Sequence, residues 1–291
     1  MIIVKIMGGL GNQLFQYALG RRLAVERGDK LKLDLSWFQK QTLRKYRLDQ
    51  YQISAEIAVE NDLKYFDYMK RKDFLARVFR KYQSLLPYYR RRYVVQIGNE
   101  FAPAILNVPN NVFLKGYWQS EQYFKPIEKI IRQDFQLNSP LTPNYQSLSA
   151  QIQSSVSISI HIRRGDYAHN PHFNARYGSL TLEYYQRAVE MIRLKVPDPL
   201  FFIFSDEPEW VQNNFCLESP SIIVQEDGEN SDVQQLYLMS LCNHHIIANS
   251  SYSWWGAWLG VSPDKIVISP SKWFASKNNN KDLLPAGWIK L

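Results

Sequence analysis

Two adjacent arginines near the middle of the chain are the residues best suited to bind an anion. Ile158 and Ile160 alternate with serines, a pattern typical of a strand with one buried face. Arg163 and Arg164 follow this strand directly, and Gly165 then permits a sharp turn. The planar guanidinium matches phosphate oxygens and stays charged at any working pH. Because open α/β sheets bind ligands at the carboxyl ends of their strands, we predict a phosphate site here; the alternative is a surface ion pair after an edge strand.

A run of serines forms a second candidate anion site. Ser250, Ser251 and Ser253 precede a predicted helix that begins at Trp254. Hydroxyls, backbone amides and the positive end of a helix dipole would all favour a bound phosphate there. The alternative is that these serines only cap the helix, although three in four positions exceeds what capping needs.

The elements that must position these residues read as alternating strands and helices, which favours parallel sheets. In the first half, a strand at 1–6, a helix at 13–27 and a second strand at 31–35 form a β-α-β unit, and further on we expect a strand at 111–119 and a helix at 120–133. In the second half, we expect strands at 200–204, 221–224, 245–248 and 265–269, helices at 182–195 and 232–241, the latter capped by Asp232, and a polar loop at 168–178. The proline-containing stretch 138–144 is the best candidate for a domain boundary.

The first loop imitates a dinucleotide-binding fingerprint. Gly9 and Gly11 are followed by an acidic residue, Asp34, at about the right distance. However, Leu14 occupies the position where that fingerprint needs glycine or alanine, so we disfavour a nicotinamide cofactor. Asn12 is the side chain of this loop best suited to hydrogen-bond a sugar or a phosphate, and the alternative is that it caps the helix.

Composition narrows the class of protein. The 291 residues carry a net charge of +8, which favours anionic partners, but no nucleic-acid-binding motif is present and we expect no nucleic-acid partner. Cys216 and Cys242 lack metal-ligand spacing, and we expect both thiols to be reduced and buried. We therefore expect the protein to reside in the reducing cytoplasm. No apolar run is long enough to span a bilayer, and residues 1–6 read as a strand rather than a signal peptide.

Residues 66–93 differ from the rest of the chain. They hold nine basic residues and two acidic ones, interleaved with apolar side chains. Within a predicted helical region at 60–95, this pattern is typical of amphipathic helices that contact an anionic membrane surface. A helical pair that covers one edge of the sheet explains it equally well.

The chain resembles the bacterial-type α-1,2-fucosyltransferases of glycosyltransferase family 11. The resemblance is carried by His161-Ile-Arg163-Arg164-Gly-Asp166 and by three further stretches in the expected order. These are Gly8-Gly-Leu-Gly11-Asn12-Gln13, Phe204-Ser-Asp206 with Glu209-Trp210, and His245 to Trp258.

The resemblance implies roles for individual residues. His161 and Asp206 would contact the guanosine, and Arg164 would bind the β-phosphate, with Arg163 sharing that contact or bracing the site. The loop with Gly9, Gly11 and Asn12 would help to place donor and acceptor. Asp166 is the nearest acid, but from its position beside two arginines we expect it to orient them. For His161 and Asp206 the alternatives are a core histidine and the cap of a helix before Pro208.

The resemblance also implies a fold and a reaction. The fold would be α/β, with two Rossmann-like domains in a GT-B-like arrangement: residues 1–142 on the acceptor side and 143–291 binding the donor. L-fucose would pass from GDP-β-L-fucose to O2 of a galactose-terminated glycan with inversion, without a metal or other cofactor, since no DxD pair is present. The general base is not identified. The alternatives are another GDP-sugar donor, or a non-catalytic protein that binds nucleotides or glycans.

Overall fold

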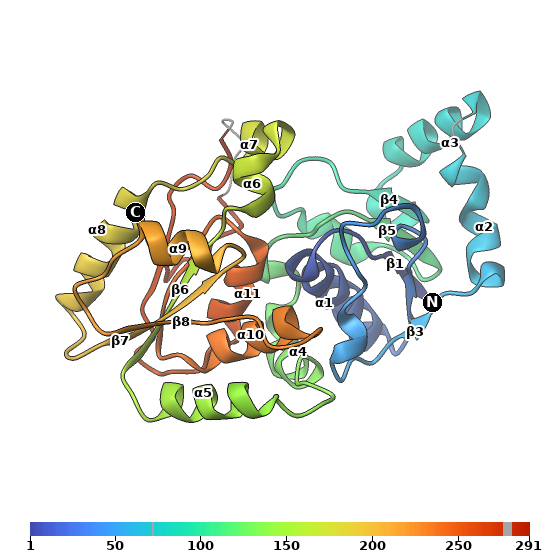
Figure 1. Ribbon diagram of the computed structural model, residues 1–291. Helices are drawn as coiled ribbons and strands as arrows, with labels where there is room; N and C mark the ends of the chain where they lie inside the picture. The colour runs from blue at the N-terminus through green and yellow to red at the C-terminus, as the bar shows by residue number, and fades with distance from the viewer. Residues whose placement is uncertain (72, 276–280) are drawn as a thin grey trace. The chain divides into compact units, whose positions relative to one another are not determined.

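The chain folds into two α/β units. The computed structural model describes residues 1–71, 73–275 and 281–291. The first unit comprises residues 1–138 with 281–283, and the second comprises 139–280 with 284–291 (Figure 1). The division falls within the stretch 138–144, where the sequence breaks between periodic segments.

The first unit is built on a five-stranded parallel sheet. Its strand order is β3-β2-β1-β5-β4. Helix α1 (Leu10–Arg27) covers one face, where a Cβ on Gly20 would lie 2.5 Å from Val4 Cγ2. The helix begins earlier than the predicted Gln13 and ends at Gly28, whose φ of 60° suits glycine. The strands are β1 (Ile2–Lys5), β2 (Leu31–Asp34), β3 (Glu56–Ile57), β4 (Tyr93–Val95) and β5 (Val112–Lys115).

The other face of this sheet is covered by the helical region at 60–95, which contains the basic residues of 66–93. Phe66, on helix α2 (Glu60–Lys70), packs with Ile3, Tyr93 and Phe113, and helix α3 (Phe74–Leu85) follows. The expected helix at 120–133 is broken into two 3₁₀ turns (Glu121–Tyr123 and Lys125–Ile127) and helix α4 (Glu128–Asp134). Pro126 explains the break, because proline removes an amide donor from the helix.

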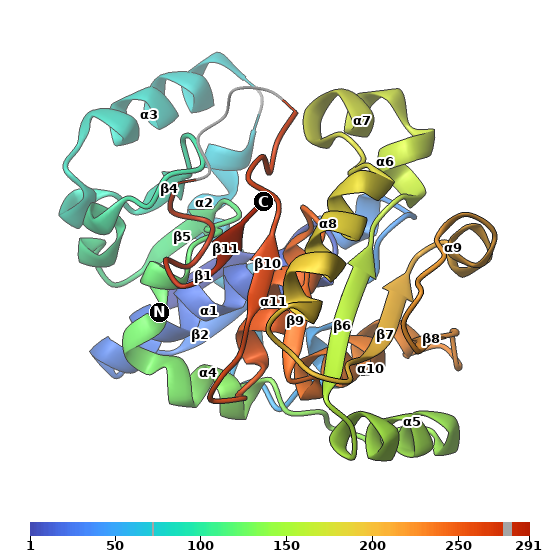
Figure 2. The same cartoon turned by 90° about the vertical axis from the view of Figure 1, so that its left-hand side faces the viewer.

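The second unit is built on a six-stranded parallel sheet. Its order is β11-β10-β9-β6-β7-β8, and Figure 2 shows β10, β9, β6, β7 and β8 in that sequence. The strands β6 (Ser157–Ile162) and β7 (Leu200–Ser205) are neighbours in this sheet. The others are β8 (Ser221–Ile223), β9 (His244–Ile246), β10 (Val267–Ser269) and β11 (Ile289–Lys290); β11 was not expected.

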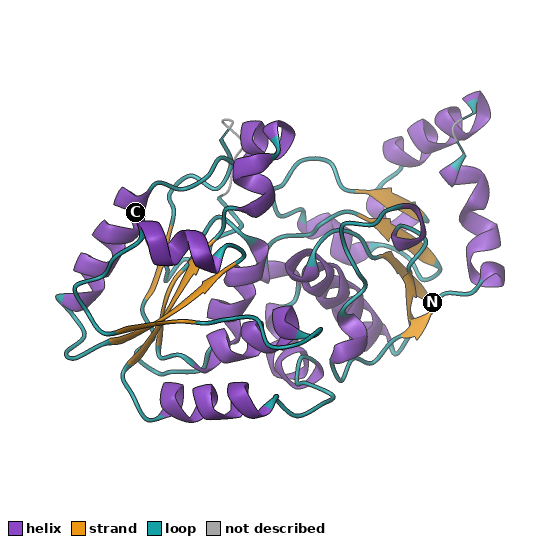
Figure 3. Ribbon diagram, viewed as in Figure 1, coloured by secondary structure: helices purple, strands orange, loops and turns teal. Residues whose placement is uncertain are grey.

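Helices cover both faces of this second sheet (Figure 3). On one face, Phe201 and Ile203 pack with α8 (Leu182–Arg193) and α9 (Pro208–Asn214). On the other, Phe202 and Phe204 pack with α5 (Pro143–Gln153) and α10 (Ser231–Leu241). The prediction of a single buried face for β6 is therefore wrong, because all six of its residues are buried.

The serines of β6 are buried because their hydroxyls have partners. Ser157 Oγ donates to Asn243 Oδ1 over 2.9 Å, and Ser159 Oγ lies 2.8 Å from His245 Nδ1. A paired hydroxyl can be buried at little cost, whereas an unpaired one cannot. The alternation of serine and isoleucine thus marks two different buried faces.

Three other local expectations are corrected. The polar stretch 168–178 is not a loop but forms most of two short helices, α6 (Gly165–His169) and α7 (Pro171–Tyr177). Helix α10 is capped at Asn230, so Asp232 lies inside its first turn. Helix α11 (Ser251–Leu259) starts before Trp254, and Ser250 is its N-cap.

The cysteines differ in environment. Cys242 is buried as expected, whereas Cys216 is exposed, so the prediction of burial is wrong for Cys216. Neither forms a disulfide. Within the described ranges, every helix is too short or too polar to cross a bilayer.

Candidate anion-binding site

The adjacent strands β6 and β7 bring Arg163 and Asp206 together. Ile162 is paired with Ser205, so the residues that follow the two strands meet at one edge of the sheet. Arg163 Nη1 lies 2.9 Å from Asp206 Oδ2, and the Arg164 amide donates to Asp206 Oδ1 over 2.9 Å. Asp206 thus braces both arginines, and it does not cap α9, whose N-cap is Glu207.

Arg164 is held on two sides. Its Nε donates to Glu207 Oε2 over 3.0 Å, and its guanidinium carbon lies 3.6 Å from the ring centroid of Trp210. Among the side chains that the structure describes, none accepts a hydrogen bond from its terminal nitrogens. A guanidinium fixed by its Nε and one face presents its outer edge to an anion.

Glu207 links this arginine to helix α6. Its second oxygen, Oε1, lies 2.7 Å from His169 Nε2. Glu207 and the cation–π contact of Trp210 were missed as site residues, although Trp210 belongs to a quoted motif and Glu207 directly follows Asp206. Their role depends on β6 and β7 being neighbours, which the local sequence does not reveal.

Gly165 is required by close approach rather than by a turn. Its φ is not in the left-handed region, but a Cβ there would lie 2.2 Å from Asp206 Oδ2. Any larger residue would displace the carboxylate that braces Arg163 and Arg164. The side chain of Asp166 lies outside what the structure describes, so its predicted role in orienting the arginines stays a prediction.

His161 is a buried histidine without the partners expected of a core residue. It is 4% exposed, its Nδ1 has no hydrogen-bond partner among the residues that the structure describes, and its ring centroid lies 5.4 Å from that of Tyr252 on α11. Burial, aided by the charge of Arg163, lowers its pKa to about 3. The imidazole is therefore neutral at neutral pH and offers one donor and one acceptor.

The serines at the start of α11 are not equivalent. Ser250 accepts from the Tyr252 amide over 3.3 Å, and Ser251 is the partly exposed first residue of the helix. Ser253 is fully buried and donates to the carbonyls of Ala248 and Ser250. Ser250 thus caps the helix, as the alternative interpretation expected, and Ser253 supports its own helix turn, whereas Ser251 is partly exposed.

In the first unit, the glycine loop is held by buried amides. Gln13 Nε2 donates to the carbonyls of Gly8 and Lys45, and Gln16 exchanges hydrogen bonds with the backbone of Met7. Asn12 is not the helix cap, because Gly9 is; Asn12 Oδ1 accepts instead from Gln119 Nε2 over 2.7 Å. Gly11 is buried inside the first helical turn.

The acidic residue of the dinucleotide-like pattern, Asp34, is buried and engaged in other contacts. Asp34 is 1% exposed, accepts from the Ser36 amide and lies 3.5 Å from Lys5 Nζ. A carboxylate committed in this way is poorly placed to bind a ribose. Within the described residues, no three His, Cys, Asp or Glu side chains are grouped as a metal site.

Solved structures share this fold of two α/β units, each built on a parallel sheet. The NodZ α-1,6-fucosyltransferase soaked with GDP-fucose matches with a TM-score of 0.57 over 92% of this chain and 94% of that chain, at 14% identity. The fold is thus that of a GT-B glycosyltransferase, with two Rossmann-like units, as predicted.

Sequence comparison identifies the family. The model of glycosyl transferase family 11 matches residues 1–291, and the chain belongs to that family. It is 32% identical to an α-1,2-colitosyltransferase from Escherichia coli, over 100% of this chain and 99% of the relative. It is also 27% identical to galactoside α-(1,2)-fucosyltransferase 2 from Pongo pygmaeus, over 51% of this chain and 45% of that protein.

Proposed function

We propose that this glycosyltransferase moves L-fucose from GDP-β-L-fucose to O2 of a galactose residue, giving an α-1,2 linkage. Family membership supports the reaction class, and likeness to a galactoside α-(1,2)-fucosyltransferase supports the linkage. The observation that carries the proposal is the fixed Arg164 at the end of β6, whose Nε is held by Glu207 and whose guanidinium lies over the ring of Trp210. A diphosphate leaving group is an anion that fits this arrangement.

The reaction is a displacement at the anomeric carbon. The acceptor oxygen forms a bond to C1 of fucose while the bond between C1 and the β-phosphate oxygen breaks. GDP leaves with the electron pair, and the acceptor hydroxyl proton passes to solvent or to a base. Arg164 would stabilise the charge that develops on the phosphate, and the α11 N-terminus with Ser250 and Ser251 would add amides and hydroxyls. In this scheme no divalent metal is needed.

The remaining roles concern the rest of the donor and the acceptor. We assign His161 to the guanosine, because its buried ring has an unpartnered nitrogen. Asp206 braces both arginines, through the side chain of Arg163 and the backbone amide of Arg164. We assign Gly9, Gly11 and Asn12 of the first unit to placing the sugar and the acceptor, a role for which the Asn12 amide has a free hydrogen-bonding capacity beyond Gln119.

Titration calorimetry with EDTA present tests the nucleotide site. The wild type should bind GDP and GDP-fucose without metal, and Arg164→Ala should lose binding. In turnover, Arg164→Ala should lower the rate about 10²–10³-fold, or roughly 2.7–4 kcal/mol of transition-state stabilisation. Arg187→Ala, an exposed arginine on α8, is the matched control and should behave as the wild type.

Three outcomes would count against this proposal. A loss of tenfold or less in Arg164→Ala would remove Arg164 from the phosphate site. Binding that requires Mg²⁺ or Mn²⁺ would contradict the metal-independent reaction. Tight GDP binding without turnover on any galactoside would indicate a non-catalytic binding protein.

A second donor is favoured by one comparison. One relative that aligns over the whole chain is a colitosyltransferase, and colitose is fucose without its 3-hydroxyl. Turnover of GDP-fucose and GDP-colitose on one galactoside acceptor, measured in competition, distinguishes the two. Preference for GDP-colitose would replace fucose in the proposal while leaving the roles of the arginines unchanged.

A further inference from the structure

Helix α3 exposes an apolar stripe. Phe74, Val78, Tyr82 and Leu85 are spaced by four, four and three residues, which places them on one side of a helix, with Leu75 beside them. Phe74 is 73% exposed, Leu75 78% and Leu85 76%. Large apolar side chains gathered on one exposed helix face usually mark an interaction surface.

The stripe is not a misoriented core face. The opposite side of α3 is the one that packs: Ala76 and Gln83 are buried, and the Gln83 amide oxygen accepts from the Arg92 backbone over 3.0 Å. Phe79 packs against the cluster around Phe66 that covers the sheet of the first unit. The helix therefore has an inner face that packs against the first unit and an exposed outer face that is apolar.

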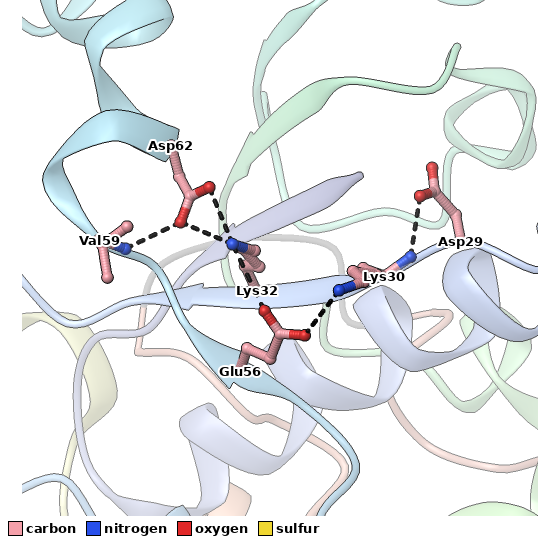
Figure 4. Close-up of polar contacts among 6 residues, drawn as sticks. All are labelled: Asp29, Lys30, Lys32, Glu56, Val59 and Asp62. Atoms are coloured by element: carbon pink, nitrogen blue, oxygen red, sulfur yellow. Dashed lines mark hydrogen bonds and ion pairs between the residues drawn. The ribbon is translucent and has the colours of Figure 1, made fainter.

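The helix that leads into α3 is anchored at its start. Lys32 Nζ, on β2, lies 2.8 Å from both carboxylate oxygens of Asp62, and Asp62 also accepts from the Val59 amide (Figure 4). Glu56 on β3 joins this network through Lys30 and Lys32. These contacts fix the first turn of α2 to the edge of the sheet. Phe66 fixes the following turns by packing on the face of the sheet.

Positive charge is concentrated around the stripe. Residues 66–93 hold nine of the 35 basic residues and two of the 27 acidic ones, which leaves 26 against 25 for the rest of the chain. The net charge of +8 thus falls to +1 without this segment. Arg71, Arg77 and Lys81 on α2–α3, and Arg90 and Arg92 beyond it, are exposed.

Aromatic side chains complete the pattern. Tyr65, Tyr82 and Tyr89 are each more than half exposed, and the guanidinium of Arg92 lies 5.8 Å from the Tyr65 ring centroid. Tyrosine and arginine suit the headgroup level of a bilayer, where an apolar body meets a polar tip. A nucleic acid would use the charge but not the apolar stripe.

We propose that the outer face of α3, with the basic residues around it, docks this enzyme on the surface of an anionic lipid membrane. Phe74, Leu75, Val78 and Leu85 enter the boundary between headgroups and acyl chains, and the arginines and lysines contact lipid phosphates. The helix lies in the plane of the surface and does not span the bilayer. This docking is independent of which sugar the enzyme transfers.

Vesicle co-sedimentation of the full chain tests this surface. The wild type should sediment with vesicles of phosphatidylcholine mixed with phosphatidylglycerol, and not with phosphatidylcholine alone. Added salt should release it, because each exposed basic residue near an anionic surface contributes roughly fivefold to the partition coefficient. Arg77→Glu with Lys81→Glu should lower binding on the order of tenfold or more.

The apolar contribution is tested separately. Leu75→Ser with Leu85→Ser should lower partitioning on the order of tenfold at constant charge. The matched control is Leu194→Ser with Val261→Ser, two apolar residues of the second unit that are at least as exposed, and this variant should bind as the wild type does. GDP titration of every variant checks the fold and is not expected to change.

Either of two results would overturn the proposal. One is equal binding of the wild type and Leu75→Ser with Leu85→Ser to anionic vesicles. The other is no vesicle binding by the wild type, together with a dimer in sedimentation velocity that Leu75→Ser with Leu85→Ser abolishes; a second copy of the chain would then cover the stripe.

Discussion

At the scale of single residues, the candidate site is a set of ionic contacts that position one guanidinium. Asp206 braces Arg163 and the backbone of Arg164, while Glu207 and Trp210 hold the Arg164 side chain. Each acid is less than a quarter exposed, so these contacts are partly protected from screening. Such bracing reduces the conformational freedom that Arg164 must lose when an anion binds.

Glu207 should therefore act as a positioning residue for Arg164. We expect Glu207→Ala to weaken GDP binding about tenfold, because a charge-assisted hydrogen bond to Nε is lost, and Glu207→Gln to recover part of it. Titration of GDP and of guanosine distinguishes positioning from a general structural role. If Arg164 contacts phosphate, the loss appears for GDP and not for guanosine.

The exposed Glu218 of the same unit provides the control for this experiment. Its side chain is 94% exposed and lies 4.0 Å from Arg193, so Glu218→Ala should leave both titrations unchanged. An equal loss of guanosine and GDP affinity in Glu207→Ala would show that Glu207 maintains the fold of the edge and not the orientation of Arg164.

The buried His161 should make stability depend on pH. Its pKa is lowered from 6.5 to about 3, so the unfolded chain binds more protons than the folded one between these values. Its contribution is fully present above about pH 6.5 and is lost as the pH falls toward about 3. Between about pH 7 and about pH 5 the loss amounts to roughly 2 kcal/mol, at about 1.36 kcal/mol for each unit.

Urea unfolding of wild type and His161→Asn at several pH values measures this contribution. The variant should lose less stability on acidification, although burial also lowers the pKa of His244 and of His245, so part of the dependence persists. The exposed His172 provides a control, since His172→Asn should follow the wild type. Parallel curves for wild type and His161→Asn would contradict the lowered pKa of His161.

At the scale of elements, the sequence predicts best where periodicity is strong and long. The helix at 182–195 and the strands at 200–204 and 31–35 lie close to α8, β7 and β2, because their apolar side chains repeat over several residues. The two-residue strand β11 offers no such repeat, and it exists only because β10 supplies its hydrogen-bond partners. The helices α6 and α7 were missed because their residues are polar and turn-like.

The sequence predicted which residues belong to the candidate site, but not which of them contact one another. Arg163, Arg164 and Asp206 were all singled out, but Asp206 was assigned to guanosine and the bracing of the arginines to Asp166. The contact between the Arg164 amide and Asp206 spans 42 positions in the chain. It depends on β6 and β7 being neighbours, which is a property of strand order in the whole sheet.

At the scale of the whole molecule, each unit has its own parallel sheet, and the candidate phosphate-binding groups belong to the second. We expect GDP to slow backbone hydrogen exchange at the end of β6, the start of α9 and the start of α11, because bound ligand suppresses local opening. Mass spectrometry of peptic peptides measures this. Protection confined to the first unit would contradict the assignment of the donor to residues 143–291.

The same measurement examines the glycine loop of the first unit. If Gly9, Gly11 and Asn12 help to place the donor, residues 8–13 should gain protection with GDP-fucose beyond that seen with GDP. An equal response to both ligands would separate this loop from the sugar.

The buried polar pairs beside β6 determine where along the sheet the arginines stand. A strand lined only by aliphatic side chains can shift by two residues along its neighbour and still bury similar surface. Here such a shift would separate Ser157 from Asn243 and Ser159 from His245, at about 1–3 kcal/mol for each group left unsatisfied. Replacing Ser159 and His245 by two well-packed aliphatic residues would therefore stabilise the core but remove a contact that sets the register of β6. The position of the arginines at the end of this strand would then no longer be fixed by polar contacts inside the core.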